Sequence, residues 1–230
     1  MLFTGIGAQG TKFPKEGSAT QSNTLVDGKL FLKEGWAIKS SKSLRENGAI
    51  ISTIGFSPVG WYPTSVPSTV LAALVENGVY TDPYFGMNLK KIPDLTRNSW
   101  WYRTEFVLPT EYADKTVWLH FNGINYKANI WLNGQKIADS TQVQGMHRLF
   151  EFDITSYVTF TENNCLAVEV FAPTSHDLWD TWVDWNPTPP DKDMGIWQDV
   201  YLKASGPVAM RRPYVCLLYT SPSPRDRTRS

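Results

Sequence analysis

The chain has 230 residues with equal numbers of acidic and basic side chains, so its formal net charge is zero. A nucleic-acid-binding protein needs a basic face to neutralise phosphates, and this charge balance argues against that class. The length allows one large all-β domain or two small ones, and it is enough to bury a substantial core. The high content of aromatic residues, with ten Trp, ten Tyr and eleven Phe, suits packed sheets and sugar recognition alike.

The only cysteines are Cys165 and Cys216, and no cysteine or histidine spacing is typical of a disulfide framework or a zinc site. We therefore expect no metal and no cofactor. The first residues lack a charged segment followed by an apolar core, and nowhere are there ~18 consecutive apolar residues. No signal peptide or membrane span is visible. A truncated start would hide a leader, so the compartment stays unknown.

Residues 1–33 are rich in Gly, Ser, Thr and Lys, and we expect a poorly ordered lead there. Two short extended pieces are expected next, at Trp36–Ser40 and Ala49–Thr53. Ser68 or Thr69 then caps the one substantial helix that the sequence predicts, over residues 69–76, and Gly78 follows as the stop signal.

Alternating strands dominate the rest of the chain. The Asn133-Gly134 pair tolerates positive φ and predicts a two-residue hairpin turn. The predicted strands cover residues 100–106, 117–121, 127–132, 135–140, 149–154, 164–171 and 196–202. Many short strands with turns between them indicate an all-β sandwich of the jelly-roll type, over residues 34–215.

The segment Trp179–Pro190 contains three tryptophans, two aspartates, an asparagine and three prolines. Its prolines exclude a regular helix and favour a stiff loop. Indole faces beside carboxylates suit a sugar ring, whose C–H face lies on an aromatic plane while its hydroxyls bond to acids and amides. The alternative is that these tryptophans close one end of the core, although buried aspartates would then need partners.

Residues 216–230, from Cys216 through Ser-Pro-Ser-Pro-Arg-Asp226, resemble a sequencing-library adapter translated in frame. We interpret them as a non-native, disordered tail because they have nothing to bury. On this interpretation the natural chain continues past Val215.

Several motifs together identify a family resemblance. They are Val66-Pro-Ser-Thr-Val70, Asp82-Pro-Tyr-Phe-Gly-Met-Asn88, Trp100-Trp-Tyr-Arg-Thr-Glu-Phe106, His120-Phe-Asn-Gly-Ile-Asn-Tyr126, Asn129-Ile-Trp-Leu-Asn-Gly134, Phe152-Asp-Ile-Thr155, Trp182-Val-Asp-Trp-Asn-Pro187 and Met194-Gly-Ile-Trp-Gln-Asp-Val200. In this order they resemble the N-terminal, galactose-binding-like jelly-roll domain of glycoside hydrolase family 2, in the branch of exo-β-D-glucosaminidases and mannosylglycoprotein endo-β-mannosidases.

This resemblance implies an accessory domain of a retaining β-glycosidase that acts on β-linked glucosamine or mannose. The two catalytic carboxylates of such an enzyme lie on a (β/α)8 barrel outside this chain, so no catalytic residue is assigned here and the chain alone is expected to be inactive. The resemblance places Asp184 as a hydroxyl acceptor and Trp185 as an aromatic wall, with Asn186 beside them. Trp179 and Trp182 are interpreted as packing residues. Two other functions remain open: a free-standing lectin-like module and a purely structural domain.

Other polar candidates have simpler explanations. His120 and His147 have no nucleophile or carboxylate at a recognisable motif spacing, so a catalytic triad is unsupported. Asp191 and Asp193 suggest a calcium site, but the lysine between them favours a solvated turn. Arg103 and Glu105, two apart on one strand, are predicted to form an exposed pair.

Overall fold

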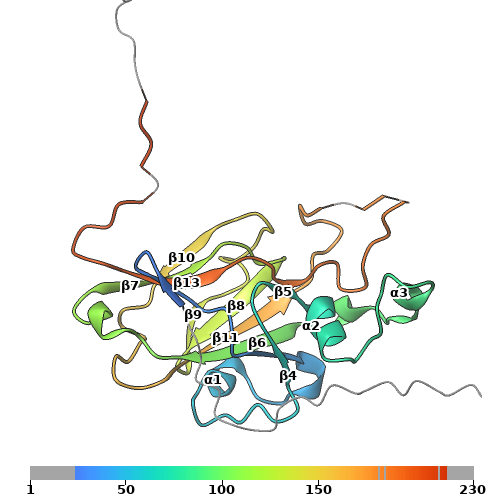
Figure 1. The fold of residues 1–230 in the computed structure, drawn as a ribbon, viewed down its shortest axis with the longest axis horizontal. Coiled ribbons are helices and arrows are strands. Elements are labelled where there is room, and N and C mark those ends of the chain that lie inside the picture. Colours follow the sequence, from blue (N-terminus) through green and yellow to red (C-terminus); the bar gives the residue numbers. More distant parts are fainter. Residues whose placement is uncertain (1–23, 181, 184, 212, 217–230) are drawn as a thin grey trace, which may run out of the picture.

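The computed structural model describes residues 24–180, 182–183, 185–211 and 213–216. Most of its regular structure is strand (Figure 1). The strands are β1 (Thr24–Val26), β2 (Lys29–Phe31), β3 (Trp36–Ser40), β4 (Tyr62–Thr64), β5 (Ser68–Thr69), β6 (Trp100–Phe106), β7 (Thr116–Phe121), β8 (Lys127–Leu132), β9 (Gln135–Ala138), β10 (Phe150–Asp153), β11 (Asn164–Phe171), β12 (Gly195–Ile196) and β13 (Val200–Ser205).

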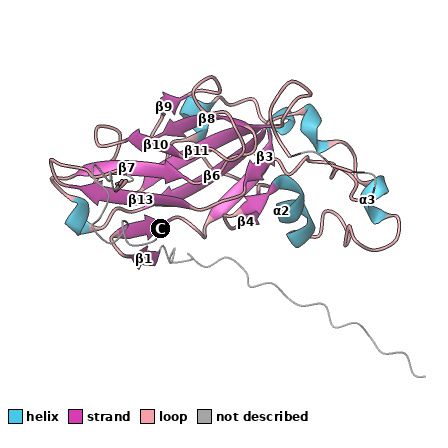
Figure 2. Cartoon of the chain, turned by 90° about the horizontal axis from the view of Figure 1, so that it is seen from above, coloured by secondary structure: helices cyan, strands magenta, loops and turns pink. Residues whose placement is uncertain are grey.

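Helical segments are short. They are α1 (Gly48–Ile51), α2 (Val70–Glu76), α3 (Asn88–Lys91) and the 3-10 turns Ser41–Ser43, Leu95–Arg97 and Thr110–Tyr112. Both α2 and α3 lie at one end of the strand layers (Figure 1 and Figure 2). The described residues include no helix that is long and apolar enough to cross a membrane.

Antiparallel pairing joins the strands into two main sheets. One has the order β1-β2-β13-β7-β10 and the other the order β4-β3-β6-β11-β8-β9, while β5 and β12 form a separate pair. The large core between the sheets includes Leu119 of β7, Ile130 of β8 and Leu202 of β13, each at most 1 % exposed. The predicted all-β sandwich is confirmed, and burial alternates along β7 and β8 as the sequence pattern predicts.

Two local signals are also confirmed. Thr69 caps α2, since its hydroxyl accepts a 3.2 Å hydrogen bond from the Ala72 N–H, and Gly78 follows with φ of 69°. Asn133 and Gly134, with φ of 48° and 85°, form the turn between β8 and β9.

The strand predicted at Ala49–Thr53 is wrong, because that segment contains the single-turn helix α1. Asn47 caps it by accepting a hydrogen bond from the Ile50 N–H at 3.2 Å. The helix lies on the outer face of the six-stranded sheet, where Ile51 packs with Trp101 in a second core cluster. Packing against the sheet therefore determines the helical conformation of residues 48–51 more than the hydrophobicity of the segment does.

The prediction that Arg103 and Glu105 form an exposed pair is also wrong. Arg103 is 4 % exposed, and its guanidinium bonds to Glu105 at 2.6 Å and donates to the carbonyls of Ile51 and Thr53 at 3.0 Å each. The α1 segment covers this face of β6 and brings backbone acceptors to the charge.

The prediction of a poorly ordered segment over residues 1–33 is corrected in part. Residues 1–23 lie outside the described residues, but β1 and β2 belong to the five-stranded sheet. Leu30 and Leu32 are 4 % and 1 % exposed. These strands are short, and β2 pairs with β13 about 170 residues later, so no local pattern marks them.

The single strand expected over 196–202 is divided between β12 and β13. Residues 217–230 of the expected tail lie outside the described residues.

Candidate functional site

A long loop over residues 172–194 leaves the end of β11 and returns to the sandwich at β12. It projects beyond the strands at the end of the molecule that also carries α2 and α3 (Figure 1). It contains the aromatic segment Trp179–Pro190, of which residues 181 and 184 lie outside the described residues. The expected hydroxyl acceptor Asp184 is thus not among the described side chains.

The outgoing arm of the loop is fixed to the start of β8. Asp177 accepts hydrogen bonds from the N–H and hydroxyl of Thr174 and forms an ion pair with the Lys127 ammonium at 2.9 Å. The phenol oxygen of Tyr126 accepts a bond from the Leu178 N–H at 3.2 Å. Partial burial acts to raise the pKa of Asp177, but Lys127 and Thr174 together hold that pKa below its ordinary value.

The returning arm is fixed by buried polar groups. Asp191 is fully buried and accepts hydrogen bonds from the backbone N–H of Leu71 at 2.7 Å and of Asp193 at 3.1 Å. The amide nitrogen of Asn125 donates to the carbonyls of Lys192 and Asp193 at 2.8 and 2.9 Å.

The expected solvated turn at Asp191 and Asp193 is therefore wrong, because Asp191 is needed inside as an acceptor for the first turn of α2. The described residues contain no group of three or more His, Cys, Asp or Glu side chains placed to hold a metal ion.

Acidic side chains gather where the two arms meet. Asp180 lies 3.1 Å from Nε2 of His147, and the His147 ring packs edge-on against Trp197 with the ring centroids 5.3 Å apart. Burial first, and then the charges of Asp191 and Asp180, raise the pKa of Asp193 to about 6. Local sequence patterns gave no sign of this cluster, since its members come from three separate segments.

The three tryptophans of the loop have different environments. Trp179 is partly buried, with the Lys192 ammonium 5.3 Å from its ring centroid, and Trp182 is partly buried as well. Trp185 is 83 % exposed. Asn186 is also exposed, and its backbone N–H donates to the carbonyl of Val183 at 2.9 Å in a tight turn. Of these three tryptophans, Trp185 is thus the one whose indole is exposed to solvent.

A shallow depression of about 330 Å³ lies beside this loop. Its polar lining comes from Asp94, Thr96, Thr188 and Lys192. The Asp94 carboxylate already accepts from the N–H and hydroxyl of Thr96, and these bonds lower its pKa. Hydroxyl groups, a carboxylate and an ammonium group thus line this depression, and such groups are suited to hydrogen bonding with the hydroxyls of a polyhydroxylated ring.

The motifs of the sequence analysis are brought together around this loop. Ser68 and Thr69 pair with Ile196 and Gly195 as β5 and β12, directly beneath the returning arm. The backbone of Asn125, from another motif, exchanges two hydrogen bonds of 2.9 Å with Gly195. Two main antiparallel sheets around one core, with the aromatic loop fixed at one end, define a β-sandwich domain.

The sequence model of the family described as "Glycosyl hydrolase 2 galactose-binding domain-like" matches residues 36–180. The chain belongs to this family. It is 39 % identical over 183 residues to an exo-β-D-glucosaminidase of Amycolatopsis orientalis, covering 79 % of this chain and 17 % of that protein. It is 36 % identical over 225 residues to the exo-β-D-glucosaminidase of Streptomyces avermitilis, covering 96 % of this chain and 24 % of the relative.

Another relative is the mannosylglycoprotein endo-β-mannosidase of Lilium longiflorum, 30 % identical over 211 residues, with 79 % of this chain and 22 % of that protein covered. Among solved structures, the exo-chitosanase CsxA of Amycolatopsis orientalis superimposes with a TM-score of 0.71 at 38 % identity, over 77 % of this chain and 21 % of that chain. The chain therefore spans about a fifth of the length of these relatives.

Proposed function

We propose that this chain supplies part of the substrate-pocket wall of a retaining β-glycosidase that acts on β-linked glucosamine or mannose. The observation that carries the proposal is the 83 % exposure of Trp185 on a loop whose two arms are held by buried or paired carboxylates. A large apolar ring exposed to water on a loop that is fixed at both arms is typical of a contact surface. The names of the relatives give the class of substrate.

Within this wall, Trp185 stacks on the C–H face of a sugar, Asp184 accepts hydrogen bonds from its hydroxyls, and Asn186 supplies an amide. Asp184, Trp185 and Asn186 are consecutive in the sequence, so we expect a sugar lying against the indole to be within reach of all three. Asp191 and Asn125 act as positioning residues that hold the returning arm.

Hydrolysis is assigned to a (β/α)8 barrel elsewhere in a longer protein, which is also the proposed partner of this domain. Retaining cleavage needs two carboxyls about 5 to 5.5 Å apart. The acids at the base of the loop have other functions: Asp191 binds two backbone N–H groups, and Asp180 pairs with His147. We therefore expect the isolated chain to be inactive. We further propose a domain that extends from β1 to about residue 215, with 216–230 outside it.

A chimera tests the proposal. Residues 24–206 replace the corresponding part of the Amycolatopsis orientalis exo-β-D-glucosaminidase, and hydrolysis of PNP-β-D-glucosamine is measured. Loss of a charged hydrogen bond to the substrate in Asp184→Ala is expected to cost ~2 kcal/mol, or about 30-fold in kcat/KM. Trp185→Ala is expected to lower kcat/KM about tenfold, because one stacking surface is lost.

The control for this experiment is Val59→Ala, which truncates a side chain that is 85 % exposed outside the loop. It should leave kcat/KM unchanged. Equal activity of all three variants would show that the domain only supports the barrel. Micromolar binding of chito-oligosaccharides by the isolated chain would instead favour a free-standing lectin-like module, since a half-pocket binds weakly.

A further inference from the structure

The turn over residues 82–88, which leads into α3, places three large apolar side chains in solvent. Tyr84 is 96 % exposed, Phe85 75 % and Met87 58 %. This segment is one of the family motifs, and the substrate contacts proposed for the aromatic loop do not involve it. A single exposed apolar side chain is ordinary, but three within four residues form a patch, and such patches are typical of contact surfaces.

Hydrogen bonds within the 82–88 turn define its shape. The Asp82 carboxylate accepts from the Tyr84 N–H at 2.9 Å. The Asp82 carbonyl accepts from the Phe85 N–H at 3.3 Å and from the side-chain amide of Asn88 at 3.0 Å. Gly86 has a φ of 57°, a conformation that favours glycine. The exposed side chains therefore belong to a turn with its own hydrogen bonds.

The 82–88 turn lies at the same end of the sandwich as the aromatic loop (Figure 1). Just after α3, the N–H of Leu95 donates to the carbonyl of Pro190 at 2.9 Å. The depression of about 330 Å³ beside the loop is lined from both of these segments. The exposed patch and the exposed Trp185 are therefore at one end of the molecule, and the segments that carry them are in contact.

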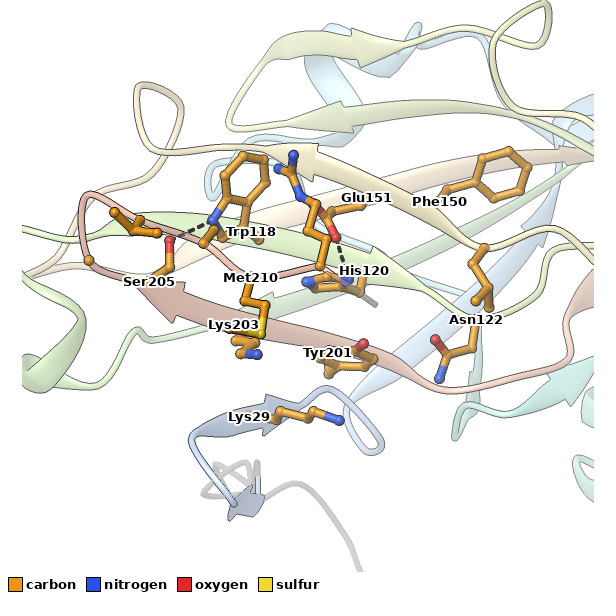
Figure 3. Close-up of a pocket in the computed structure, with 15 residues that line it drawn as sticks. Lys29, Trp118, His120, Asn122, Phe150, Glu151, Tyr201, Lys203, Ser205 and Met210 are labelled. Carbon is orange, nitrogen blue, oxygen red and sulfur yellow. Dashed lines mark hydrogen bonds and ion pairs between the residues drawn. The ribbon is translucent and has the colours of Figure 1, made fainter. Parts of the chain in front are cut away.

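The outer face of the five-stranded sheet is a weaker candidate for a docking surface. A cavity of about 760 Å³ lies over it, beneath the segment 206–211 that follows β13 (Figure 3). The side chains in this cavity already contact one another. The rings of His120 and Tyr201 stack 4.5 Å apart, and Glu151 forms an ion pair with Arg211. A partner that bound there would have to replace these contacts.

We propose that the 82–88 turn docks this domain onto the catalytic barrel of a longer protein, with Tyr84, Phe85 and Met87 packed against an apolar surface of that barrel. This inference rests on the proposed function, in which the barrel is the partner. A domain that lines a substrate pocket must meet the barrel at the end that carries the aromatic loop, and the turn is exposed at that end. The chain covers 17 % of one exo-β-D-glucosaminidase and 24 % of another, so each relative has ample further polypeptide to cover the patch.

A second copy of this chain is the competing occupant. Lys90 and Lys91 lie in α3, directly after the turn, and neither forms a salt bridge among the described residues. In a two-fold symmetric dimer the same patch meets itself, which would bring these like charges together. The charge beside the patch therefore favours a different partner.

Protection of Met87 from oxidation tests the docking. The chimera with the Amycolatopsis orientalis enzyme and the 230-residue chain are treated with hydrogen peroxide, and sulfoxide in the peptide that contains Met87 is followed by mass spectrometry. We expect Met87 to be oxidised at least fivefold more slowly in the chimera, where the barrel covers it. The matched control is Val59→Met, which places a methionine at a position that is 85 % exposed outside the turn. That methionine should be oxidised at the same rate in both proteins.

Substitution of the exposed rings gives a second measurement. Replacing both Tyr84→Ser and Phe85→Ser should leave the Tm of the 230-residue chain unchanged, because the two rings are in water there. In the chimera the same double substitution should lower the Tm of this domain by about 4 °C or more, since the contact with the barrel is lost. Val59→Ser should change neither Tm. If the doubly substituted chimera fails to fold, Met87 oxidation in the parent chimera still decides.

Equal oxidation of Met87 in chain and chimera would overturn the proposal, as would an unchanged Tm in the doubly substituted chimera. A dimer of the 230-residue chain that the double substitution makes monomeric would assign the patch to a second copy. A lower kcat/KM with unchanged Tm and unchanged Met87 protection would assign the rings to substrate. Oxidation and melting need no substrate, so docking can fail while the kinetics of Asp184→Ala and Trp185→Ala support the pocket wall, and the reverse.

Discussion

The carboxylate of Asp191 accepts a 2.7 Å hydrogen bond from the backbone N–H of Leu71, 120 residues earlier in the chain. This contact joins the first turn of α2 to the returning arm of the aromatic loop. Asp191 has no exposed surface, and it also accepts from the Asp193 N–H. A single buried acid thus fixes a helix end and a loop end relative to each other.

Asp191→Ala should destabilise the fold by about 1 to 3 kcal/mol, because two backbone N–H groups lose their acceptor in a dry site. Urea unfolding followed by fluorescence measures the change. Asp139→Ala is the control, since Asp139 accepts from Thr141 in a turn at the surface and its loss should change stability much less. Equal effects of the two substitutions would contradict the structural role of Asp191.

Arg103→Leu should lower the free energy of unfolding by about 3 kcal/mol, because Glu105 and the carbonyls of Ile51 and Thr53 lose a buried donor. Arg97 provides the matched control. Its pair with Asp94 is exposed, so Arg97→Leu should change stability by less than ~0.5 kcal/mol. The same denaturant titration compares both. A change below 1 kcal/mol in Arg103→Leu would mean that α1 does not depend on this charge.

Stability should depend on pH through Asp193. Its pKa is about 6 in the folded chain, against 3.8 for an ordinary aspartate, so the folded state binds this proton more tightly than the unfolded state does. The free energy of unfolding must therefore fall as pH rises from about 4 to about 6, by about 1 kcal/mol after allowance for solvent screening.

Asp193→Asn should remove this fall, and the asparagine side chain tolerates the positive φ of 55° found there. The quantity to compare is the difference in unfolding free energy between parent and variant, at pH 4.5 and at pH 7.5. Asp94 and Asp177 have lowered pKa values, so their contributions to stability rise with pH. Both residues are present in parent and variant, and the difference therefore cancels their contributions. A pH-independent difference would show that Asp193 is not desolvated.

The two thiols should differ sharply in reactivity. Cys165 is fully buried in β11, and burial raises its pKa to about 12, whereas Cys216 is exposed. We expect a disulfide reagent such as DTNB to modify one thiol per native chain within minutes, and the second only after unfolding in guanidinium chloride. Cys216→Ser should abolish the fast phase. Two fast thiols would mean that β11 opens readily.

Features whose cause lies within a few residues were predictable. The Thr69 cap, the Asn133-Gly134 turn and the alternation along β7 each follow from neighbouring side chains and backbone preferences. The aromatic loop was predictable for the same reason, because its prolines exclude helix. The order of the motifs was sufficient to indicate the family, although no single motif was specific.

Burial and strand pairing that depend on a distant segment of the chain were not predictable. The sequence around Arg103 resembles that of a surface strand, and only the packing of α1 on β6 buries its charge. Asp191 was expected in water, yet it lies beneath the loop because the first turn of α2 needs an acceptor there. The strand β2 is stabilised by pairing with β13.

The sequence by itself thus determined the fold class, the main helix, the hairpin and the family, because these depend on short-range patterns. Tertiary structure alone decided which charges are buried, how burial and the neighbouring acids raise the pKa of Asp193, and that Lys29 faces Lys203 beside the Tyr201 ring. The physical reason is that burial and electrostatic interaction depend on distances between segments far apart in the chain, and only the packed sheets fix those distances.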